Sequence, residues 1–147
     1  MNALSRYFYS QSAGMFFLRL VTGLIFLLHG ATKVGSIAMI AGFFGSLGLV
    51  PAIGWAWFIG LLEVIGGAAL ILGVATRVFG TLFAIEMIVA VFLTGIGKGF
   101  NAHALELLLA AASLAIALSG SGRWSVYPLE CENCGALVCD GETCAAV

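Results

Sequence analysis

Charged residues are scarce in this sequence. Six Lys or Arg and seven Asp or Glu occur among its 147 residues, of which 62% are hydrophobic. A water-soluble domain of this length cannot bury that much apolar surface, because a small domain hides only part of the surface that its chain exposes. The scarcity of charge therefore argues against a soluble domain. It predicts an integral membrane protein with the lipid bilayer as its solvent.

Clusters of basic residues are missing as well. The formal net charge is -1, and no run of Lys and Arg is interleaved with aromatic residues. Proteins that bind nucleic acid neutralise its phosphates with such basic patches. We therefore expect no nucleic acid among the partners of this protein.

Proline is rare, with Pro51 and Pro128 as its two occurrences, so long apolar helices can run without a break. A helix needs roughly 20 apolar residues to span a membrane. Four stretches meet this requirement: residues 14–34, 54–76, 78–96 and 101–120. The expected fold class is all-α, an integral membrane four-helix bundle over residues 1–128 with a short cysteine-rich C-terminal tail over residues 129–147.

The stretch between the first two spans is apolar but broken. Residues 36–53 contain Gly42, Gly45, Gly48 and Pro51. Glycine and proline interrupt helices, and irregular backbone is not tolerated where it faces lipid. We expect this stretch to lie in the membrane interface or to fold back instead of crossing.

The flanking cations predict an orientation. An even number of spans places both termini on one side of the membrane. Arg6, Arg77 and Arg123 fall on that side, whereas Lys33 and Lys98 fall on the other. Because cytoplasmic loops carry an excess of Lys and Arg, this count favours cytoplasmic termini.

Ionisable residues inside the expected spans are the candidate functional site. A charge within a bilayer is costly and is usually placed toward the interior of the bundle. Since neighbouring helices run in opposite directions, one group of residues should meet near the end of the bundle that carries the first loop. Its members, the candidate catalytic residues, are His29, Lys33, Glu63, His103 and Glu106.

A second, smaller group is expected nearer the side that carries the termini. There Arg19 of the first span and Glu86 of the third are expected to form a structural ion pair. Two interpretations of both groups stay open. The charges can simply neutralise one another and fix the helix register, as buried pairs do. Alternatively, they can relay protons or bind the polar head group of a quinone.

Short motifs in the first two spans resemble the DoxX family of small four-helix membrane proteins. The motifs are Leu18-Arg19-Leu20, Gly23, Phe26, His29-Gly30, Lys33, Glu63, Gly66-Gly67, Leu72-Gly73 and Thr76-Arg77. The resemblance extends over about residues 14–128. It implies a four-span bundle in a bacterial or archaeal cytoplasmic membrane and an association with oxidoreductases. The DoxD relatives are subunits of a membrane thiosulfate:quinone oxidoreductase. Residues Arg19, His29, Lys33, Glu63 and Arg77 match the family pattern, which assigns none of them a catalytic role.

The tail departs from that family pattern. Its cysteines have the spacing C-x2-C-x4-C-x4-C, which resembles a zinc knuckle with a cysteine in place of the usual histidine: Cys131, Cys134, Cys139 and Cys144. Four thiolates suit tetrahedral zinc, or alternatively iron or an iron–sulfur cluster. Two disulfides in an oxidising compartment and an exchanging dithiol pair are the competing interpretations.

Two functions are compatible with these features. The first is a membrane subunit of an oxidoreductase system that holds a quinone or relays protons beside a redox partner protein. The second is a non-catalytic anchor or assembly subunit whose metal-bound tail docks a partner protein. A transporter is a more distant third.

Overall fold

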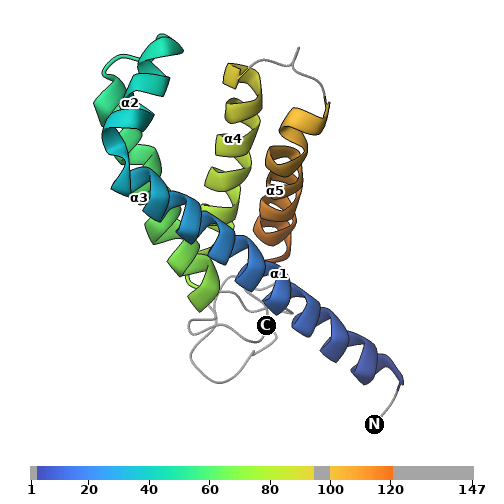
Figure 1. Cartoon of the computed structure of the whole chain (residues 1–147). Helices are drawn as coiled ribbons and strands as arrows, with labels where there is room; N and C mark the ends of the chain where they lie inside the picture. The colour runs from blue at the N-terminus through green and yellow to red at the C-terminus, as the bar shows by residue number, and fades with distance from the viewer. Residues whose placement is uncertain (1–2, 95–99, 121–147) are drawn as a thin grey trace, which may run out of the picture.

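The structure is a computed structural model that describes residues 3–94 and 100–120, with side chains described for residues 13–94 and 103–120. These residues form five helices and no strand (Figure 1). The helices are α1 (Ala3–Gly35), α2 (Ile37–Ser46), α3 (Ala52–Leu72), α4 (Thr76–Thr94) and α5 (Phe100–Ser119). The expected all-α class is confirmed.

Two helix boundaries differ from the expected spans. Helix α1 begins at Ala3, well before residue 14, and its apolar portion, Ala13–Gly35, follows without a break. Helix α3 ends at Leu72, because Gly73 adopts a left-handed conformation with φ of 78° that few other residues tolerate. Thr76 therefore begins α4 and does not belong to the second span.

Helix α2 accounts for the broken apolar stretch. It has 10 residues, which corresponds to a length of about 15 Å, roughly half the hydrocarbon core of a bilayer. It packs against α3 (Figure 1). This agrees with the expectation that the segment does not cross the membrane.

Three helical segments are long and apolar enough to span a bilayer: Ala13–Gly35, Ala52–Leu72 and Thr76–Thr94. Many of their large apolar side chains are exposed, such as Phe17, Ile65 and Phe92, as expected for a surface that faces lipid rather than water. Helix α5 has 20 residues, and its described portion, His103–Ser119, is apolar. The protein is thus an integral membrane helical bundle. A fourth span through α5 and the orientation of the termini stay predictions.

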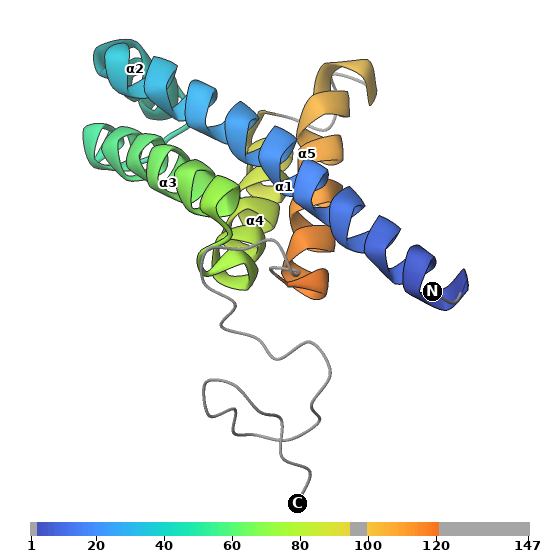
Figure 2. The same cartoon turned by 90° about the horizontal axis from the view of Figure 1, so that it is seen from below.

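The helices associate as two close pairs, α1 with α3 and α4 with α5, and the pairs touch each other much less (Figures 1 and 2). Glycines make the close approach possible. A Cβ atom on Gly23 would lie 2.7 Å from the carbonyl oxygen of Gly67, and a Cβ on Gly80 would lie 2.8 Å from that of Ser113. Helices in lipid associate by such backbone proximity, because hydrocarbon offers no hydrophobic drive between them.

Aromatic stacking joins the two pairs in the middle of the bundle. The rings of Phe26 on α1 and Phe83 on α4 lie with centroids 3.8 Å apart and planes 7° apart. Both rings are fully buried, together with Leu70 and Ile116. Away from this contact, toward the end that carries α2, the pairs separate and leave room for a cavity lined by all five helices.

Candidate functional site

The strongest polar contact described in the bundle joins α1 to α3. Lys33 Nζ lies 2.7 Å from Glu63 Oε1 and donates a hydrogen bond to it. The Glu63 side chain is 2% exposed and the Lys33 side chain 25% exposed. An isolated buried charge costs several kcal/mol, and a hydrogen-bonded partner offsets that cost. The structure therefore brings together two of the five candidate catalytic residues.

Glu86 on α4 is the third member of this cluster. Its Oε1 atom lies 3.9 Å from Lys33 Nζ, and its side chain is 8% exposed. The sequence places Glu86 in an ion pair with Arg19, but the structure holds its carboxylate beside Lys33 and Glu63 instead. Arg19 is buried on α1, two turns before Phe26.

Depth explains the difference. Glu63 lies nine residues before the end of α3 at Leu72, and Glu86 lies ten residues after the start of α4 at Thr76. At 1.5 Å per residue, both carboxylates stand roughly 14 to 15 Å from the short turn that joins the helices. The sequence predicts a second span that ends at residue 76 and a third that begins at residue 78. Those boundaries place the two carboxylates at different depths, so the sequence does not predict their proximity.

The cluster lies on the wall of the cavity, whose volume is about 600 Å³. Lys33, Glu63 and Glu86 line it, together with His29 on α1 and Glu106 on α5. The rest of the lining is almost entirely apolar or aromatic. Such a combination, an apolar cavity with a few convergent polar groups, is typical of small-molecule sites.

His103 lies elsewhere. It is buried on α5, one turn before Glu106, and it is not among the residues that line this cavity. Four of the five candidate catalytic residues therefore face one cavity. Their catalytic role stays a prediction.

Three carboxylate oxygens of the cluster make no hydrogen bond within the described part of the chain. They are Oε2 of Glu63 and both oxygens of Glu86. Buried acceptors are nearly always satisfied in proteins. With one ammonium beside two carboxylates, the three ionised groups would carry a net charge of -1. The arrangement can therefore hold a proton, and it can accept hydrogen bonds from a polar group in the cavity.

The sequence signals the polar residues of the site but not its apolar walls. Phe43 and Phe44 of α2 and Trp55 and Phe58 of α3 line the cavity, although aromatic residues at such positions are typical of an interfacial collar. The spacing of three residues between Trp55 and Phe58 indicates a shared helix face. That spacing does not reveal that the face borders a cavity.

The tail cysteines lie outside the described residues. Within the described residues, no group of His, Cys, Asp and Glu is arranged to hold a metal ion. The metal site, and the anchor function that depends on it, stay predictions.

Comparison with known proteins identifies the family of this chain. The family model described as DoxX matches residues 14–96. The chain is also 38% identical over 120 residues to a protein of Bacillus subtilis (strain 168) named "Putative oxidoreductase CatD", and this match covers 81% of the chain and 88% of that protein. No solved structure matches the chain. The family match covers more than half of the sequence and includes the Lys33, Glu63 and Glu86 cluster, and this chain belongs to the DoxX family.

Proposed function

We propose that this protein is the membrane subunit of an oxidoreductase system and that its cavity holds the head group of a quinone. The observation that carries the proposal is the cluster of one ammonium and two buried carboxylates, Lys33, Glu63 and Glu86, on the wall of an apolar cavity of about 600 Å³. Membership in the DoxX family and similarity to a protein named as a putative oxidoreductase support the redox part of the proposal.

The residues present fit such a head group. A quinone has carbonyl oxygens that accept hydrogen bonds, and the Lys33 ammonium on the cavity wall is a donor. A quinone supplies the two-electron chemistry, taking up two protons as it is reduced. Glu63 and Glu86 provide buried carboxylates that can carry protons to and from the ring oxygens. The electrons are supplied by a redox partner protein.

Binding of a tailless naphthoquinone to the purified protein in nanodiscs tests this function. Lys33→Gln should weaken binding by about tenfold to a hundredfold, since a hydrogen bond from a charged group contributes roughly 1.5 to 3 kcal/mol. Arg77→Gln is the matched control: it removes the same charge from an exposed position on α4 that does not line the cavity. It should bind like the parent protein.

Circular dichroism and a monodisperse elution profile would establish that both variants fold. If the parent protein does not bind the ring, or if the two variants bind it equally well, the proposed site is wrong.

A further inference from the structure

The side of the cavity between α3 and α4 is built from two apolar stripes. Trp55, Phe58 and Leu62 line it from α3, and Leu82, Ile85 and Val89 line it from α4. Within each helix these residues are three or four positions apart, so each set lies on one helix face. The two faces border the same cavity. They therefore form opposite walls of a slot that leads toward the buried carboxylates.

Helix packing does not seal this slot. Contacts between α3 and α4 are few, in contrast to the close pairs α1 with α3 and α4 with α5. Phe58 and Ile85 line the cavity and yet are 56% and 54% exposed. Both lie within segments long and apolar enough to span the membrane. Their exposed surface is therefore accessible to the hydrocarbon of the bilayer.

Polarity along the slot changes from the inside outward. Glu63 and Glu86 are almost fully buried, whereas the apolar residues of the two stripes reach the lipid-facing surface. A molecule matched to this gradient has a polar head and an apolar tail. A small water-soluble ring would leave the two outer stripes unused.

We propose that α3 and α4 frame a lateral opening to the bilayer, and that the molecule taken up through it is a quinone with an isoprenoid tail. The head lies beside Lys33, Glu63 and Glu86, and the tail lies along the stripes of Phe58 and Ile85. This inference rests on the proposed function and narrows its substrate class to tailed, membrane-dissolved quinones.

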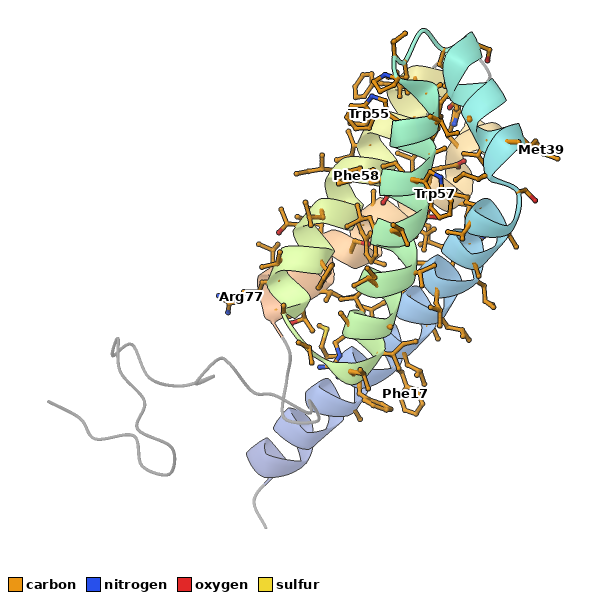
Figure 3. All side chains as sticks on the ribbon, turned by 90° about the vertical axis from the view of Figure 1, so that its left-hand side faces the viewer. Phe17, Met39, Trp55, Trp57, Phe58 and Arg77 are labelled. Atoms are coloured by element: carbon orange, nitrogen blue, oxygen red, sulfur yellow. The ribbon has the colours of Figure 1, made fainter. Side chains whose placement is uncertain are left out.

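Two tryptophans of α3 form a matched pair of fluorescent probes for this opening. Trp55 lines the cavity and is 42% exposed, whereas Trp57 does not line it and is 43% exposed. Two residues apart on a helix, the two side chains point to different sides of α3 (Figure 3). They thus share residue type, helix and exposure, and differ in whether they face the slot.

The experiment uses full-length protein in nanodiscs and a naphthoquinone with an isoprenoid tail as the fluorescence quencher. Single-tryptophan variants keep either Trp55 or Trp57, with the other two of the three tryptophans changed to Phe. Trp55 fluorescence should fall to a saturating level at low quinone content. Trp57 should be quenched only in proportion to the quinone dissolved in the membrane. The experiment compares which tryptophan is quenched and does not compare binding affinities, because a tail gains little free energy by leaving lipid for another apolar surface.

A photoreactive group at the end of the tail provides a second measurement. It should label peptides that contain Phe58 and Ile85, and excess unlabelled tailed quinone should prevent the labelling. Leu24 and Leu28, exposed on α1 and outside the cavity lining, report non-specific labelling from the membrane, which competition does not change.

Equal quenching of Trp55 and Trp57, or labelling of α1 and the α3 and α4 stripes alike, would overturn the lateral opening. If the tailless ring still binds in that case and Lys33→Gln still weakens it, the head-group site stands and only the opening fails. If the tailless ring does not bind either, the proposed function fails with it.

Discussion

At the scale of single residues, Lys33 links the two close helix pairs, α1 with α3 and α4 with α5. It lies on α1, donates a hydrogen bond to Glu63 on α3 and lies 3.9 Å from the Glu86 carboxylate on α4. Its ammonium therefore stabilises two carboxylates from two helix pairs that otherwise touch little. Removing it leaves two buried acids without that cation, whereas removing an acid as well relieves part of the cost.

A double-mutant cycle tests this pairing. Lys33→Met alone should lower the melting temperature in detergent more than Lys33→Met combined with Glu63→Gln, with a coupling of roughly 1 to 3 kcal/mol. The reason is that the single change leaves Glu63 buried without its hydrogen-bonded cation. Arg77→Met combined with Glu63→Gln is the control and should be additive. Additivity in the Lys33 cycle would mean that the pair contributes no specific stability.

At the scale of helices, glycine decides how closely α1 and α3 approach. The atoms nearest to a Cβ on Gly23 include the backbone carbonyl of Gly67 at 2.7 Å and the Ile71 backbone nitrogen at 3.2 Å. Backbone atoms cannot rotate away as a side chain can. An added methyl group must therefore push the two helices apart, and with them Lys33 and Glu63.

Gly23→Ala and Gly14→Ala make a matched comparison within α1. Gly23→Ala should destabilise the protein by about 1 to 3 kcal/mol through overpacking. Nothing lies within 4 Å of a Cβ on Gly14, so Gly14→Ala should be neutral or stabilising by up to about 1 kcal/mol, owing to the better helix propensity of alanine. Thermal unfolding in detergent measures both. Equal melting temperatures would show that α1 and α3 can shift apart at no cost.

At the scale of the whole molecule, the bundle and the tail need different sources of folding free energy. The bundle is stabilised by helix packing in lipid, with backbone polar groups satisfied inside each helix. Residues 129–147, which are acidic and contain no Lys or Arg, are too few for a hydrophobic core of their own. We propose that their four cysteines bind one tetrahedral metal ion, zinc or alternatively iron, because a structural zinc site can supply on the order of 10 kcal/mol of folding free energy.

Elemental analysis of protein purified without chelator tests the tail. We expect one zinc or iron ion per chain, and we expect any single Cys→Ser change in the tail to release it while the melting temperature of the bundle stays the same. The four positions are Cys131, Cys134, Cys139 and Cys144. Four free thiols or two disulfides by mass spectrometry, with metal below stoichiometric amounts, would contradict the proposal.

The sequence by itself determines that this is an all-helical membrane protein and which residues are its intramembrane charges. Composition and the length of apolar runs suffice for the first, because lipid tolerates so few structures. The second follows because charges are rare enough in apolar spans to be recognised individually, as Lys33, Glu63 and Glu86 are.

Only the tertiary structure decides which of these charges meet. The left-handed turn at Gly73 and the start of α4 at Thr76 set the depth of Glu86, and a shift of a few residues in either boundary would move that carboxylate by several ångströms. The cavity depends on a property that involves still more of the chain: the α1–α3 pair makes few contacts with the α4–α5 pair. Sequence patterns record the face of a single helix, whereas a cavity exists only where the faces of several helices fail to close against each other.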